Sequence, residues 1–164
     1  MAAVGVIAVD AGYLALIRSQ GGPPSDNPLV TPFIASYFAV VAAALIASLL
    51  MPPAMKGALR GAAAAGLLLT ALLTGFSIGA AVLIPAVIAI VATVLTVRHN
   101  PGTRTAVATV AGIVVGVAVL VIGLQMAWQQ VVCPAIGESG GSIASWLGSG
   151  GTYECNNGIL TVQR

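Results

Sequence analysis

One ionisable side chain lies where a membrane span is expected, and its position suggests chemistry. Asp10 is the sole charged residue between Met1 and Ile17. A helix that starts at Met1 and rises 1.5 Å per residue puts Asp10 about 14 Å deep, near the middle of a bilayer's hydrocarbon core. A carboxylate at that depth is costly unless it faces protein or a water-filled cavity, and such residues often serve proton or cation pathways. Asp10 is therefore the first candidate for a coupling residue.

Two hydroxyl side chains could complete an intramembrane polar site with Asp10. Tyr13 follows at i+3, a spacing that puts both side chains on one helix face, and Thr70 is expected at a similar depth in a later span. No Lys or Arg is expected inside a span, so we expect Asp10 to be protonated or hydrogen-bonded to hydroxyls. The alternative is a structural clamp between helices, worth about 0.6 kcal/mol, and a lone carboxylate favours it. A tilted or late-starting span would instead leave Asp10 near the surface.

The composition indicates the class of protein that must position these residues. The 164 residues are 59% hydrophobic and 6% charged, whereas about 25% of the residues in a soluble domain are charged. So few charged groups could not cover a globule, which indicates a polytopic membrane protein. The few dispersed basic residues exclude a nucleic-acid partner. No CxxC, HExxH, phosphate-loop or GxSxG motif occurs, so we expect no enzyme, no cofactor and no metal site.

Five apolar segments are long enough to be spans, which predicts an all-α transmembrane domain over residues 1–128. The run from Gly57 to Val97 would make a helix about 60 Å long, twice the bilayer thickness, so it must fold back near residues 74–77, where small and polar residues interrupt it. The predicted spans cover residues 2–17, 33–51, 57–74, 77–97 and 106–128.

Basic residues predict the orientation of these spans, because short loops rich in Lys and Arg stay in the cytoplasm. The loop assigned between spans two and three carries Lys56 and Arg60. The loop assigned between spans four and five carries Arg98, His99 and Arg104. The N-terminus is then cytoplasmic and the tail of residues 129–164 is extracytoplasmic. Arg18 is the one basic residue that this topology puts on the outer side.

Both cysteines lie in the predicted outer tail. Disulfides persist in oxidising compartments, so Cys133 and Cys155 are expected to form one. The alternatives are a metal pair or two free thiols, and a metal pair would lack further ligands because His99 is expected across the membrane. Asn157-Gly158 is the preferred pair for a type I′ turn, which predicts a β-hairpin of residues 153–156 and 159–162. Residues 142–148 are expected to form one or two helical turns, with Ser142 as the N-cap.

Small residues and two tryptophans suggest how the helices pack and where they end. Glycines spaced four apart favour close helix association, but they are too frequent here for every match to count. We interpret one set in span five, Gly112, Gly116 and Gly123, as a packing face, within the bundle or against another subunit. The earlier pair Gly57 and Gly61 is given no such weight. Trp128 and Trp146 are expected to anchor the chain at the membrane interface.

These observations favour a non-catalytic integral membrane protein that serves as an accessory or scaffolding subunit of a larger complex. Its partners would be the lipid bilayer and that complex, and the Ala-, Gly- and Val-rich composition suggests a bacterial plasma membrane. The alternative is a small oligomeric transporter or channel that uses Asp10. A membrane enzyme acting on lipid is a third and weaker hypothesis.

Overall fold

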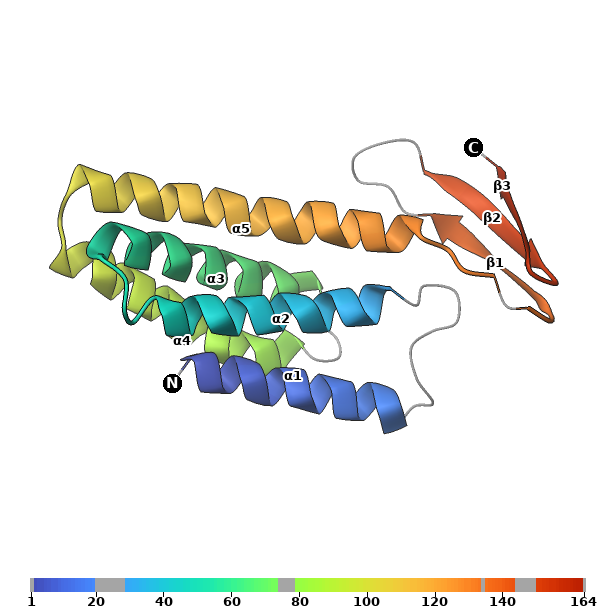
Figure 1. Ribbon diagram of the computed structural model, residues 1–164, viewed down its shortest axis with the longest axis horizontal. Helices are drawn as coiled ribbons and strands as arrows, with labels where there is room; N and C mark the ends of the chain where they lie inside the picture. Colours follow the sequence, from blue (N-terminus) through green and yellow to red (C-terminus); the bar gives the residue numbers. More distant parts are fainter. Residues whose placement is uncertain (1, 20–28, 74–78, 134, 144–149, 164) are drawn as a thin grey trace. The chain divides into compact units, whose positions relative to one another are not determined.

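Five long helices and a small sheet make up the computed structural model, which describes residues 2–19, 29–73, 79–133, 135–143 and 150–163 (Figure 1). Each helix is long and apolar enough to cross a membrane. The helices are α1 (Ala2–Ser19), α2 (Val30–Ala47), α3 (Pro53–Leu73), α4 (Gly79–His99) and α5 (Thr103–Gln129), and the strands are β1 (Glu138–Ile143), β2 (Gly151–Asn156) and β3 (Ile159–Gln163).

The helix boundaries differ from the predicted spans by a few residues, and proline explains the largest difference. We expected the second span to reach Met51, but α2 ends at Ala47. The residue before a proline is disfavoured in the helical conformation, and Pro52 follows Met51. The chain therefore leaves α2 through a tight turn, in which the Leu49 amide donates to the Ile46 carbonyl at 3.0 Å. Pro53 then occupies the first position of α3, where a missing amide hydrogen costs nothing. The predicted turn at 74–77 lies outside the described residues.

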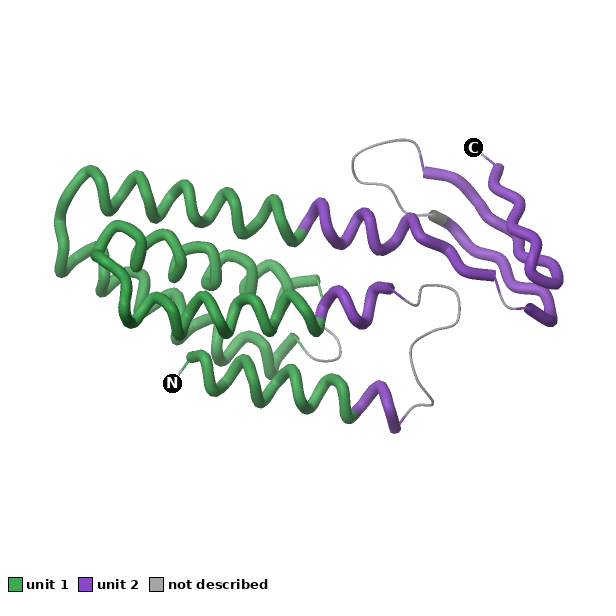
Figure 2. Tube along the Cα trace, viewed as in Figure 1, with its two compact units in different colours: residues 1–15, 35–120 green, residues 16–34, 121–164 purple. Residues whose placement is uncertain are grey.

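The chain divides into two compact units, coloured separately in Figure 2. Unit 1 contains residues 1–15 and 35–120, and unit 2 contains residues 16–34 and 121–164. Unit 1 thus holds α3, α4 and most of the other three helices. Unit 2 holds the remaining ends of α1, α2 and α5 together with the sheet.

Within unit 1, α3 and α5 run parallel and approach closely through small residues. A Cβ atom on Gly61 of α3 would lie 2.8 Å from the Thr109 carbonyl oxygen of α5. In return, a Cβ on Gly116 of α5 would lie 2.6 Å from the Ala62 carbonyl oxygen of α3, and one on Gly112 would lie 2.7 Å from the Ala58 Cα. Ordinary contact begins at 3.4 Å, so each of these positions accepts hydrogen alone.

Tyr37 of α2 packs into the same part of unit 1. Its ring lies against Gly66 of α3, where a Cβ would overlap the phenol oxygen. Its hydroxyl donates a hydrogen bond of 3.3 Å to the Gly116 carbonyl of α5. A buried tyrosine needs such a partner because an unsatisfied hydroxyl is costly in an apolar interior. Tyr37 therefore links three helices.

The sheet of unit 2 is antiparallel, with the strand order β1-β2-β3. Asn156 pairs with Ile159 at the turn, and Tyr153 pairs with Val162 further along. Asn157 and Gly158 both have positive φ, at 45° and 85°, as a type I′ turn requires. The predicted hairpin is therefore confirmed, one or two residues longer in each strand.

The prediction for the segment before the hairpin was wrong. Residues 142–148 were expected to begin a short helix at Ser142, but Ser142 lies in β1 and pairs with Thr152 of β2. A glycine has a role in this pairing, because a Cβ on Gly141 would lie 2.9 Å from the hydroxyl oxygen of Tyr153. The ring of Tyr153 thus covers the glycine on the neighbouring strand. Most of the predicted helical segment, including Trp146, lies outside the described residues.

Candidate functional site

Arg60 has the most extensive set of polar contacts in unit 1. It lies within α3, two turns from the start of the helix, and is partly buried. Its Nη1 donates to Thr96 Oγ1 of α4 at 2.7 Å and to the Ala92 carbonyl at 3.4 Å. Its Nε donates to Ser48 Oγ at 3.3 Å, just after the end of α2. The prediction that Arg60 lies in a loop between two helices was therefore wrong, because Arg60 lies within α3.

A cavity of about 400 Å³ adjoins Arg60, and we call it the basic pocket. Four of its seven lining residues carry basic side chains, and all come from α3, α4 and the residue after α4. The lining residues are Lys56, Arg60, Leu95, Thr96, Arg98, His99 and Asn100. The pocket is shallow and open to the surface, and its lining suits an anion because several basic side chains face one space.

No acidic side chain balances the basic pocket among the described residues of unit 1. The one carboxylate there is Asp10, in the middle of α1, and it does not line this cavity. The structure gives Lys56, Arg98 and His99 no ion pair with any residue it describes. The positive charges of Lys56 and Arg98 are therefore not neutralised by a carboxylate among the described residues of unit 1.

A second cavity, of about 260 Å³, shares Arg60 with the basic pocket. We call it the apolar cavity, because apart from Arg60 and Ser48 its lining is aliphatic. The lining residues are Ala2, Ala3, Leu45, Ile46, Ser48, Leu49, Arg60, Ile88 and Ala92. Arg60 thus stands between a cationic cavity and a hydrocarbon-lined one.

Asp10 lies on the face of α1 that also carries the buried residues Val6 and Tyr13. Its Oδ1 atom is shielded from solvent and has no hydrogen-bond partner among the residues that the structure describes. The proposed partners do not reach that atom: Tyr13 is buried on the same helix, and the Thr70 hydroxyl donates instead to the Gly66 carbonyl at 2.8 Å. The structure therefore does not assemble the expected polar site around this atom.

The remaining predicted residues occupy packing positions. Gly112 and Gly116 face α3 inside unit 1, where they contact Ala58 and Ala62 of the chain's own helix. The pair Gly57 and Gly61, which we had discounted, packs as closely against Thr105 and Thr109 of α5. In unit 2, Gly123 lies against the ring of Phe33, and Trp128 near the end of α5 is half-buried.

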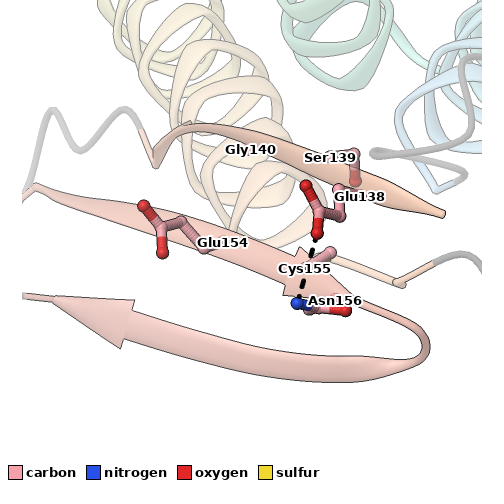
Figure 3. A pocket seen from close by; sticks show the side chains of 6 residues that line it. All are labelled: Glu138, Ser139, Gly140, Glu154, Cys155 and Asn156. Atoms are coloured by element: carbon pink, nitrogen blue, oxygen red, sulfur yellow. Dashed lines mark hydrogen bonds between the residues drawn. The ribbon is translucent and has the colours of Figure 1, made fainter.

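The tail is fastened by the predicted disulfide between Cys133 and Cys155, whose Cα atoms are 5.4 Å apart. A shallow pocket of about 450 Å³ lies on the sheet, and Figure 3 shows the side chains that line it, among them Glu138 of β1 and Glu154 of β2. The Asn156 side-chain amide donates to the carboxylate of Glu138 at 3.4 Å. The described residues contain no group of three His, Cys, Asp or Glu that could hold a metal ion.

Comparisons with protein-family models, with curated proteins and with solved structures give no match for this chain. The candidate site therefore depends on the geometry alone. Sequence reasoning located the cations of the basic pocket but interpreted them as loop charges that set orientation. A usable signal was present, because Lys56 and Arg60 are four residues apart and share one helix face.

Proposed function

We propose that this chain is an integral membrane protein of a bacterial plasma membrane, with its N-terminus in the cytoplasm and its tail outside. Five helices of 18 to 27 residues with mean hydropathies of 1.3 to 2.8 support the insertion. The exposed surfaces of these helices are largely aliphatic, with Val4, Leu72 and Val107 each about 70% exposed. Exposed apolar area of this extent is typical of a lipid-facing surface. The basic residues near α3 and α4, together with the disulfide in the tail, support the orientation.

Within that membrane, the proposed role is a non-catalytic accessory subunit of a larger complex. The observation that carries it is the edge strand β3. No further strand pairs with the outer side of β3 among the described residues, and Ile159 on it is 70% exposed. An unprotected apolar edge attracts another strand, and such strand addition is a common mode of protein recognition. The proposed occupant is an extended extracytoplasmic segment of a partner membrane protein.

The hairpin geometry identifies which backbone groups would bind that segment. In a hairpin with a two-residue turn, the pair that flanks the turn exchanges both hydrogen bonds, and every second pair repeats this. Asn156–Ile159 and Glu154–Thr161 are such pairs. The amides of Leu160 and Val162 consequently point away from β2, toward the free edge.

Substitutions at Val162 test this docking surface. Val162→Pro removes an outward amide without removing a bond to β2, and proline is tolerated on edge strands. Val162→Thr is the matched control, because it keeps the amide and the β-branched shape. We expect the tagged wild-type and Val162→Thr chains, extracted in mild detergent, to give a stoichiometric assembly by native mass spectrometry, and Val162→Pro to lose it. A wild-type chain that runs alone or as a homo-oligomer would contradict the accessory role.

A second candidate, a small oligomeric proton- or cation-coupled transporter, is favoured by one observation. Oδ1 of Asp10 is shielded and has no hydrogen-bond partner in the described part of the chain, which is unusual for a buried polar atom. Coupled uptake into liposomes would then be lost in Asp10→Asn and unaffected by Val162→Pro. The accessory role predicts the reverse dependence for assembly.

A further inference from the structure

The basic pocket gathers cations that helix stability does not explain. Arg98 and His99 lie in the last turn of α4, where the negative end of the helix dipole favours them. Lys56, however, is the fourth residue of α3, where the dipole disfavours a cation. It also lies four residues before Arg60, a like-charged spacing that destabilises a helix. Charges that only orient the chain in a membrane would not need to converge on one cavity.

Arg60 is held in a fixed position beside this cavity. Its Nε and Nη1 donate to Ser48, Thr96 and the Ala92 carbonyl, and all three acceptors are neutral. The remaining nitrogen, Nη2, makes no hydrogen bond to any residue that the structure describes. A guanidinium fixed in this way retains its charge and free N–H donors for an anionic oxygen, and its planar fork suits phosphate. Fixing it in advance also lowers the entropy lost on binding.

The apolar cavity indicates the kind of molecule that carries the anion. It begins where Arg60 separates it from the basic pocket, and it is lined by aliphatic side chains of α1, α2 and α4. Ile46 and Leu49 on its border are exposed, so in a bilayer the cavity would be open to lipid. A free phosphate would use the basic pocket alone, whereas a molecule with a charged head and a hydrocarbon chain would use both.

We propose that the basic pocket binds the phosphate headgroup of an anionic phospholipid, with part of an acyl chain in the apolar cavity. Lys56 and Arg98 attract the phosphate, and Arg60 fixes its position through Nη2. This assignment depends on the proposed membrane insertion but not on the accessory role. The orientation proposed above would put the site at the cytoplasmic surface, where basic pockets between helices are suited to such lipids.

Binding of single lipids to the purified full-length chain tests the proposal. The probes are phosphatidylglycerol, phosphatidylcholine, and glycerol phosphate as the headgroup without acyl chains, each titrated in mild detergent and counted by native mass spectrometry. Lys56→Gln and Arg98→Gln remove pocket charges whose side chains make no hydrogen bond or ion pair with any residue that the structure describes, so the fold is expected to remain. Arg104→Gln is the matched control, because Arg104 lies in the first turn of α5 and does not line the pocket.

We expect phosphatidylglycerol to bind at least tenfold more tightly than phosphatidylcholine. Lys56→Gln and Arg98→Gln should each weaken that binding about fivefold, while Arg104→Gln leaves it within twofold. Glycerol phosphate should bind far more weakly than the lipid.

Equal binding of the two lipids, or an equal effect of Arg104→Gln, would overturn the assignment to this pocket. Glycerol phosphate binding as tightly as the lipid would overturn the role of the apolar cavity. Alkaline carbonate extraction of membranes reports on insertion separately, so failure of the underlying membrane insertion would be recognised.

Discussion

The close contact between α3 and α5 predicts the result of adding a single methyl group. In Gly116→Ala, the new Cβ would lie 2.6 Å from the Ala62 carbonyl oxygen and 2.8 Å from its Cα. Ordinary contact begins at 3.4 Å, and backbone atoms cannot rotate out of the way as a side chain can. The helices must therefore separate by several tenths of an ångström. A gap of that size removes a quarter to a half of the dispersion energy of the facing atoms.

A matched variant isolates this packing cost from the intrinsic helix preference of alanine. Gly12→Ala is the same change in α1, at a position where a Cβ would meet nothing within 4 Å. Replacing glycine in a helix interior should by itself stabilise by up to about 1 kcal/mol. Overpacking typically costs about 1–3 kcal/mol. The free energy of unfolding of Gly116→Ala should therefore be about 1–3 kcal/mol lower than that of Gly12→Ala.

The assay is unfolding of the purified chain in mixed micelles of mild detergent and sodium dodecyl sulfate, followed by far-ultraviolet circular dichroism. Because Gly116 faces the chain's own α3, the loss of stability should be measurable in the isolated protein without any partner. A difference between the two variants below about 0.5 kcal/mol would refute the close contact between α3 and α5. A variant that unfolds normally but fails to assemble would instead put Gly116 at a subunit interface.

Three further changes have expected outcomes. Replacing Cys133 and Cys155 by serine should destabilise the sheet by about 3 kcal/mol, because the disulfide closes a loop with a sequence separation of 22. Limited proteolysis should then cut the tail and leave the helices intact. Gly158→Ala should lower the stability of the hairpin by about 1 kcal/mol, because Gly158 has a φ of 85°. Hydrogen exchange of the β2 and β3 amides should become faster, and unchanged exchange would contradict the turn geometry. Arg60→Met should lower the free energy of unfolding by about 1–3 kcal/mol by leaving the Ser48 and Thr96 hydroxyls without this donor, whereas Arg104→Met should change it by less than 0.5 kcal/mol.

Most of the fold could be predicted from short stretches of the sequence. The five helices follow from apolar runs of sufficient length, and the hairpin follows from Asn157-Gly158, whose two residues favour the positive φ that the turn requires. The strand β1 has no such signal. Its sequence contains two adjacent glycines, which are depleted in strands, and it forms by pairing with β2 and by the cover that Tyr153 gives to Gly141.

The candidate site was less predictable because its contacts are distant in the sequence. Arg60 meets Ser48 and Thr96 across separations of 12 and 36 residues, which no spacing pattern reveals. The same limit applied to Gly57 and Gly61, whose close packing depends on α5 lying beside α3. Asp10 is the opposite case, a residue that is conspicuous in the sequence but lacks the predicted contacts. We expected hydroxyl groups to hydrogen-bond to it, and neither Tyr13 nor Thr70 does so at Oδ1.

The orientation of the chain in the membrane decides whether the docking strand faces outward and whether the lipid pocket lies at the cytoplasmic surface. Single cysteines at Gln163, near the end of the tail, and at Gly102, between α4 and α5, report on the two sides, since the native cysteines are joined in a disulfide. A membrane-impermeant maleimide applied to intact cells should label Gln163→Cys, and it should label Gly102→Cys only after the membrane is permeabilised. Labelling of Gly102→Cys in intact cells, with Gln163→Cys protected, would contradict the account.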